Sequence, residues 1–100
     1  MSVMSRELRG RLLLALNAAK GLRLGLDKLY AIVRDDHLPA TVRGVKDEMA
    51  YLESKNYATR FGSDQWQITA AGTDVVEGNI DPDPGIILPD DPEKSGRGDD

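Results

Sequence analysis

The side chains that could carry out chemistry in this 100-residue chain are few. The absence of cysteine removes thiolate catalysis, disulfides and cysteine-based zinc sites together. The single histidine, His37, follows Asp35 and Asp36, but a lone histidine in a polar turn is more often exposed or a helix cap than a metal ligand. No serine pairs with it as a nucleophile, and no two carboxylates have a spacing that indicates acid–base work rather than surface charge. We therefore expect no enzymatic activity, no metal site, no cofactor and no small-molecule ligand.

Two aromatic residues could contact nucleic acid directly. Trp66 and Tyr57 could stack on the bases of a single strand, as aromatic side chains do in proteins that bind such strands. The chain has only five aromatic residues, however, so both are more readily explained as core. The segment from Thr69 to Gly72 is rich in small residues but lacks the lysine and the glycine spacing of a phosphate-binding loop. We interpret it as a tight turn from strand to helix.

The charge of the chain is unevenly distributed. The net charge is −4. Residues 1–70 contain 11 Lys/Arg and 8 Asp/Glu and so carry +3, whereas residues 71–100 contain 2 Lys/Arg and 9 Asp/Glu and carry −7. A charge of +3 is compatible with weak phosphate binding but falls short of the basic surface of a strong nucleic-acid binder. No apolar run approaches the roughly 20 residues that a membrane helix needs, and the first residues lack the layout of a secretory signal. We expect a soluble cytoplasmic protein with no membrane partner.

The hydrophobic spacing predicts one small α+β domain over residues 1–78. Apolar residues recur at helical spacing in a first helix and again in a third helix, which Thr41 caps. The inner faces are Leu8, Leu12, Leu16 and Ala19 in the first helix and Val45, Met49 and Leu52 in the third. Alternating residues on both sides of Gly62 predict two strands joined by a turn. The expected elements are a helix over 5–20, a short strand within 22–26, a helix over 27–33, the helix from Thr41 to Asn56, strands over 57–61 and 65–69, and a last helical turn over 70–77.

Residues 79–100 differ in composition from the rest of the chain. They are acidic and contain four of the five prolines, so we expect a disordered tail that buries too little surface to offset the entropy of ordering. The exception is the triplet Ile86, Ile87 and Leu88, because three consecutive apolar residues usually need cover. These candidate partner-binding residues could add as a strand to a partner or fold back on their own domain.

The region around the third helix resembles a known family. The helix end Tyr51-Leu-Glu-Ser-Lys-Asn-Tyr57 and the strand Trp66-Gln-Ile-Thr-Ala-Ala-Gly72 resemble the recognition helix and wing of a winged helix-turn-helix domain. The match covers roughly residues 5–78. More narrowly, residues 68–78 and the Pro-Gly-Ile of residues 84–86 resemble small winged-helix proteins of Mu-like bacteriophages and prophages. The resemblance implies three helices with a β-hairpin wing and a location in the bacterial host cytoplasm.

The resemblance also implies a contact with double-stranded DNA. In this superfamily the third helix enters the major groove, while the wing touches phosphates or the minor groove. The positions that match these roles are Thr41, Arg43, Gly44, Lys46 and Asp47 on the helix and Arg60 and Ser63 on the wing. Arginine and lysine there could reach guanine edges or phosphates. Arg43 and Lys46 could equally belong to a solvated helix face, with local ion pairs to Asp47 or Glu48.

Two functions of different class follow from these observations. The first is a small phage- or prophage-type DNA-binding protein, a transcriptional regulator or DNA-handling accessory, whose acidic tail limits non-specific binding. The second is a protein-interaction module that kept the winged-helix scaffold and uses its tail to dock on a partner or another copy. A further group of basic residues in the first helix is expected to form a charged outer face or to flank a dimer contact. These residues are Arg6, Arg9 and Arg11.

Overall fold

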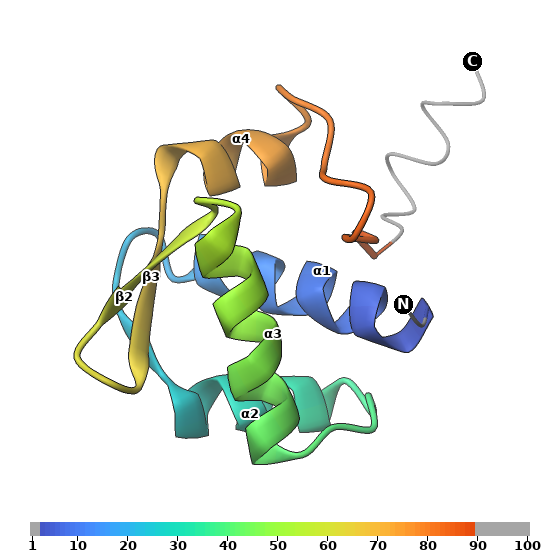
Figure 1. The fold of residues 1–100 in the computed structure, drawn as a ribbon, viewed down its shortest axis with the longest axis vertical. Helices are drawn as coiled ribbons and strands as arrows, with labels where there is room; N and C mark the ends of the chain where they lie inside the picture. Colours follow the sequence, from blue (N-terminus) through green and yellow to red (C-terminus); the bar gives the residue numbers. More distant parts are fainter. Residues whose placement is uncertain (1–2, 90–100) are drawn as a thin grey trace.

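The computed structural model describes residues 3–89 of the chain. Within this range, four helices pack beside one three-stranded antiparallel sheet, which lies along one edge of the fold, in an α+β arrangement (Figure 1). The elements are α1 (Val3–Ala18), β1 (Leu24–Gly25), α2 (Leu26–Asp35), α3 (Val42–Ser54), β2 (Ala58–Phe61), β3 (Gln65–Ile68) and α4 (Ala70–Glu77). This order agrees with the one predicted from the sequence and is compatible with a winged helix.

Local hydrogen bonds set the ends of α3 and α4. The Thr41 side chain accepts a hydrogen bond from the Gly44 amide at 2.9 Å, and the Thr69 side chain accepts one from the Gly72 amide at 3.0 Å. Such caps satisfy an amide that the first turn of a helix otherwise leaves without a partner. Gly78 ends α4 at φ 82°, a left-handed conformation that suits glycine because it has no Cβ. The cap predicted at Thr41 is confirmed.

Strand β3 lies at the centre of the sheet and pairs with β1 on one side and β2 on the other. Strands β2 and β3 form a ribbon in which Ala58 pairs with Ile68 and Phe61 pairs with Gln65. Trp66 projects from β3 into the core and is 1% exposed. Its predicted role in the core is therefore confirmed, and base stacking by this ring is excluded.

Helix α1 lies at the centre of the fold and contacts α2, α3, α4 and β3 (Figure 1). The residues predicted for the inner face of α3 are fully buried against it. The core consists of Leu8, Leu12, Leu13, Leu16, Leu29, Val33, Val45, Met49, Leu52, Ala58, Trp66, Val75 and Ile86. Burial of apolar side chains contributes roughly 25 cal/mol per Å², so this cluster is the main source of stability.

The segment after α4 differs from its prediction. The sequence predicts disorder from residue 79, but residues 79–89 turn back toward α1 and place Ile86 in the core at 4% exposure (Figure 1). Pro82 and Pro84 restrict the unfolded backbone, which lowers the entropy cost of ordering, and Ile86 supplies apolar burial. We call residues 83–88 the strap. The predicted disorder of residues 90–100 falls outside the described residues.

Smaller differences concern the ends of elements. Helix α1 ends at Ala18 rather than residue 20, because Lys20 and Gly21 adopt left-handed conformations with φ 54° and 87°. The last turn predicted after β3 is a helix of eight residues, α4. Helix α3 ends at Ser54, and Asn56 adopts a left-handed conformation at φ 65°. No helix within residues 3–89 has both the length and the apolar character needed to cross a membrane.

Candidate functional site

The outer face of α3 carries the residues predicted to contact DNA. Arg43, Lys46 and Asp47 are exposed on its first two turns. Thr41 and Gly44 have a different role, because the Thr41 hydroxyl is occupied by the Gly44 amide. A Cβ on Gly44 would lie only 3.1 Å from the Thr41 Oγ1 atom. These two residues therefore build the start of the helix, while the charged side chains face solvent.

The tip of the ribbon lies beside α3. The Lys46 Nζ atom is 3.5 Å from the Asp64 Oδ1 atom, and these two side chains are 48% and 55% exposed. On β2, the Arg60 Nε atom is 3.5 Å from the Glu53 Oε1 atom of α3. Ser63 is exposed at the ribbon tip. Helix and ribbon thus form one polar surface that two ion pairs cross.

We call this surface the α3–ribbon face. It comprises Arg43, Lys46, Asp47, Glu53, Arg60, Ser63 and Asp64. Its three cations and three anions give a net charge of zero, and within residues 3–89 Arg43 has no ion-pair partner. Lys46 pairs with Asp64 rather than with Asp47 or Glu48 as considered from the sequence. Exposed ion pairs are worth about 0–1 kcal/mol, so a competing phosphate could displace the carboxylates at small cost.

Arg23 adds a further cation to the ribbon. Its guanidinium carbon lies 3.7 Å from the centroid of the Phe61 ring, within the range of a cation–π contact. Arg23 is exposed in the loop before β1. Sequence spacing does not indicate this contact, because the fold of the sheet brings the two residues together from distant parts of the chain.

The strap lies along α1. The Ile87 amide donates a hydrogen bond to the Arg6 carbonyl at 3.0 Å. Gly10 permits this close approach, because a Cβ there would lie 1.9 Å from the Ile87 carbonyl oxygen. Of the predicted partner-binding triplet, Ile86 is in the core, Leu88 is half-buried against it and Ile87 remains 36% exposed. The triplet therefore folds back on its own domain, which was the second of the two alternatives.

A polar cluster joins the strap to α3. Arg9, 8% exposed, donates from Nη1 to the Gly85 carbonyl at 3.1 Å and from Nε to the Glu48 carboxylate at 2.5 Å. Its guanidinium carbon lies 3.6 Å from the centroid of the Tyr51 ring. The Tyr51 hydroxyl donates to the Asp83 carboxylate, which also accepts from the Gly85 amide at 2.9 Å. The cluster therefore connects α1, α3 and the strap.

The same cluster shifts two pKa values. Desolvation, followed by the hydrogen bond to Asp83, raises the pKa of Tyr51. Hydrogen bonds from the Tyr51 hydroxyl and the Gly85 amide lower the pKa of Asp83, and Lys55 contributes from 3.4 Å. The carboxylate and the phenol thus favour the ionised and the neutral form respectively.

Arg9 corrects an expectation. The sequence predicts that Arg6, Arg9 and Arg11 form a charged outer face, but Arg9 is buried between α1 and α3. Its spacing could have indicated this, because Arg9 precedes Leu13, which belongs to the core, by one helical turn. A basic residue at such a position needs buried partners, and these come from the acidic and carbonyl groups of α3 and the strap.

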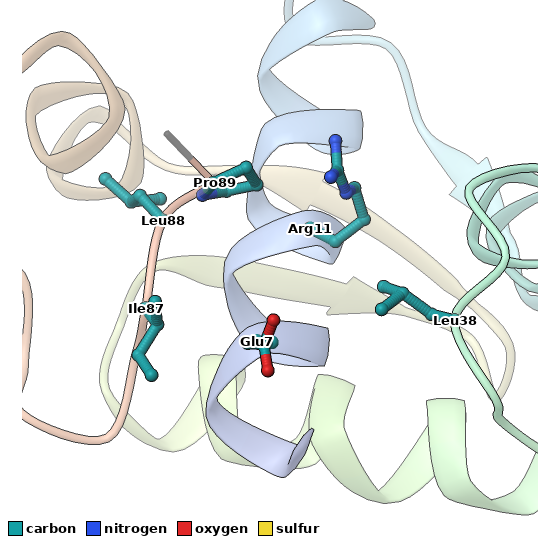
Figure 2. Close-up of a pocket in the computed structure, with 6 residues that line it drawn as sticks. All are labelled: Glu7, Arg11, Leu38, Ile87, Leu88 and Pro89. Carbon is teal, nitrogen blue, oxygen red and sulfur yellow. The ribbon is translucent and has the colours of Figure 1, made fainter. Parts of the chain in front are cut away.

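A small hollow lies between α1, the strap and the loop before α3 (Figure 2). Its volume is about 180 Å³. It is lined by Glu7, Arg11, Leu38, Ile87, Leu88 and Pro89. Ligand pockets are commonly about 300–1,000 Å³, and Arg11 already pairs with Asp36 at 3.2 Å. We infer no small-molecule site here.

His37 is exposed between α2 and α3, at φ 61°. Among residues 3–89, no three histidine, cysteine or carboxylate side chains come together as a metal ion would require. Comparison of the chain with protein-family models, with curated proteins and with solved structures found no match. What the chain does is therefore inferred from its own residues and their geometry.

Proposed function

We propose that this chain is a winged-helix domain that binds double-stranded DNA through the α3–ribbon face. The observation that carries the proposal is the 3.5 Å approach of Lys46 on α3 to Asp64 at the ribbon tip. It makes an exposed helix and a ribbon parts of one surface, so both can meet the same duplex. A helix of this kind fits the major groove while an adjacent ribbon follows the backbone.

The proposed roles follow from exposure and charge. Arg43, exposed and without an ion-pair partner in the described part of the chain, is placed to reach a base edge or a phosphate. Lys46 and Arg60 contact phosphates after exchanging their present carboxylate partners. Because the face has no net charge, binding is weak at physiological salt and depends on these few contacts. Together with the sequence resemblance, this supports a small phage- or prophage-type transcriptional regulator or DNA-handling accessory.

A titration of isotope-labelled protein with mixed-sequence duplex DNA tests the proposal. Backbone amide signals are followed at low and at near-physiological salt. We expect shifts confined to residues 41–47 and 60–64 that weaken as salt is raised, because phosphate contacts release counterions. Amides on this face that stay unchanged at low salt would overturn DNA binding.

A matched pair of variants separates a specific contact from a general charge effect. Arg43→Gln removes a charge from the α3–ribbon face, whereas Lys20→Gln removes one beside α4, from a residue that lines a hollow with Thr73. We expect Arg43→Gln to lower affinity by at least about fivefold and the salt slope by about 1, with little change in Lys20→Gln. Equal losses in both variants would count against a defined DNA face.

A second candidate is a protein-interaction module. The ion pairs Lys46–Asp64 and Arg60–Glu53 favour it, because a face of balanced charge suits a protein surface as well as a phosphate backbone. Since Ile86 belongs to the core, removal of residues 79–100 would disturb folding as well as docking. Ile87→Ser is the cleaner test, because this side chain is exposed. Loss of a partner in a folded Ile87→Ser variant, with no DNA-induced shifts, would favour this second function.

A further inference from the structure

The strap lies on a surface of α1 and α3 in the way that a peptide lies in a binding site. We call this surface, made of Arg6, Arg9, Gly10, Tyr51 and Lys55, the strap site. The Arg6 carbonyl accepts from the Ile87 amide at 3.0 Å, and Arg9 Nη1 donates to the Gly85 carbonyl at 3.1 Å. These two hydrogen bonds bind the main chain of the strap at Gly85 and at Ile87, the residues before and after the buried Ile86. None of them depends on the strap being joined to α4.

The strap site also selects side chains. Tyr51 and Lys55 hold the Asp83 carboxylate, the Lys55 Nζ atom at 3.4 Å from Asp83 Oδ1. A Cβ on Gly85 would lie 2.1 Å from the Tyr51 hydroxyl oxygen, so a larger residue would displace the Tyr51 side chain and this position favours glycine. The next residue, Ile86, enters the core at 4% exposure. The site therefore recognises a short segment with an acidic residue, then glycine two positions later, then a branched apolar residue.

The connection between α4 and the strap is exposed, and hydrogen bonds tie only its first two residues to α4. Residues 79–82 are all exposed, and the ties to α4 are hydrogen bonds from the Asn79 and Ile80 amides to the Asp74 carbonyl and a side-chain bond from Asn79 to Asp74. A change of backbone direction at Asp81 and Pro82 can redirect the strap while these bonds to α4 stay in place. Exchange of an identical element between two copies then costs little beyond the entropy of association.

We propose that the strap site binds the strap of a second copy of this chain, so that two chains exchange residues 83–88 and form a reciprocal dimer. Each strap keeps every contact described above, but to the partner's α1 and α3. At low concentration the covalent linker favours the strap of the same chain, because its effective concentration is high. At high concentration, or when the linker is too short to turn back, the exchanged dimer is favoured.

A complementation experiment tests this with full-length chains. Ile86→Asp places a charge at a buried position and disables the strap while leaving the strap site unchanged. Gly10→Ala blocks the strap site, with a Cβ 1.9 Å from the Ile87 carbonyl oxygen, but leaves the strap unchanged. Each variant alone is expected to be monomeric by light scattering, and an equimolar mixture is expected to form a 1:1 heterodimer. A mixture that stays monomeric, with both variants folded by their amide spectra, overturns the proposal.

A second variant covers the case in which Ile86→Asp does not fold. Removal of Asp81 and Pro82, both exposed, shortens the linker by about 7 Å of extended chain and leaves the bonds to the Asp74 carbonyl in place. We expect this chain to dimerise, with contacts between Ile86 of a labelled copy and α1 of an unlabelled copy detected by isotope-filtered NMR. The control, in which Gly-Ser is inserted after Asp81, is expected to be monomeric. A shortened chain that is monomeric, or dimeric without those contacts, overturns the proposal.

A synthetic peptide of residues 81–89 distinguishes a different occupant. Added to the Ile86→Asp chain, the peptide is expected to restore the amide signals of Gly10 and Tyr51. Restoration by the peptide with no heterodimer in the mixture would assign the strap site to a peptide of another protein and overturn the exchange between copies.

Discussion

The Tyr51 hydroxyl donates a hydrogen bond to the Asp83 carboxylate and so joins α3 to the strap. Arg9 of α1 contacts the same tyrosine, with its guanidinium carbon 3.6 Å from the centroid of the Tyr51 ring. The orientation of α3 against α1 is therefore fixed by polar contacts as well as by the core. Because α3 carries the proposed DNA contacts, the strap helps to orient the helix that is proposed to meet DNA.

The hydrogen bond itself can be tested by Tyr51→Phe, which keeps the ring under Arg9 but removes the hydroxyl. We expect the free energy of unfolding to fall by about 1–2 kcal/mol, because a partly buried carboxylate loses a donor. Urea unfolding followed by fluorescence of Trp66, the only tryptophan, measures the change. Tyr30→Phe is the matched control, since the Tyr30 hydroxyl makes no hydrogen bond within residues 3–89, and an equal loss in both variants would contradict the assignment.

The stabilisation by Asp83 should depend on pH. Its pKa is lowered in the folded chain, chiefly by the hydrogen bond from Tyr51. The stabilising contribution is therefore fully present above the unfolded pKa of about 3.9 and is lost as pH falls through the lower folded pKa. We expect Asp83→Asn to be less stable than the unsubstituted chain near neutral pH, and the difference to shrink below about pH 4. Asp81→Asn, at an exposed neighbouring carboxylate, is the control, and a difference that persists unchanged into acid would refute the prediction.

Gly10→Ala should destabilise the chain although it improves an α-helix. Alanine inside a helix is ordinarily favoured over glycine by about 0.5–1 kcal/mol. Here the Cβ would lie 1.9 Å from the Ile87 carbonyl oxygen, so the strap must move. We expect a net loss of about 1–3 kcal/mol in urea unfolding, with amide shifts centred on residues 85–88. A more stable variant would show that the strap does not lie against α1.

Asp64→Asn should strengthen DNA binding. The substitution removes a negative charge from the ribbon tip and releases Lys46, which lies 3.5 Å from Asp64. Exposed charge interactions of about 0.2–1 kcal/mol correspond to an affinity gain of up to about fivefold. Fluorescence anisotropy with labelled duplex at low salt measures the gain. Glu77→Gln makes the same charge change at the exposed end of α4, and an equal gain there would show a general charge effect instead.

The sequence predicted the elements whose signals are local. The α3 helix has its cap at Thr41, its inner face at Val45, Met49 and Leu52, and a left-handed Asn56 after its end, and each lies within a few residues of the others. Caps and helical periodicity act over one or two turns, so a single stretch of sequence suffices to predict them. The ribbon and the buried Trp66 were predictable for the same reason.

Local signals left the strap open between folding back and binding a partner, and they did not predict the pairing on the α3–ribbon face. The burial of Ile86 depends on a place in the core that α1 and α3 create together. The acidic composition around it points to disorder, because composition averages one buried side chain with many charged ones. Likewise, Lys46 has acidic neighbours along the helix, yet it pairs with Asp64, which the folded ribbon places 3.5 Å from its Nζ atom. Such contacts can be predicted only when the tertiary arrangement of the elements is known.

We expect the strap to be less stable against local opening than the rest of the domain. The bond from Arg9 to the Gly85 carbonyl spans 76 residues, whereas α2, α3 and the ribbon are connected by short loops. Contacts of such large sequence separation carry a large loop-closure entropy cost, so we expect them to form after the local contacts. Undocking of residues 83–88 exposes Ile86 and its place in the core but breaks fewer contacts than global unfolding, so we expect it to require less free energy. In native-state hydrogen exchange, the Ile87 amide should therefore exchange earlier than the amides of α3, through an opening that leaves the rest of the domain folded.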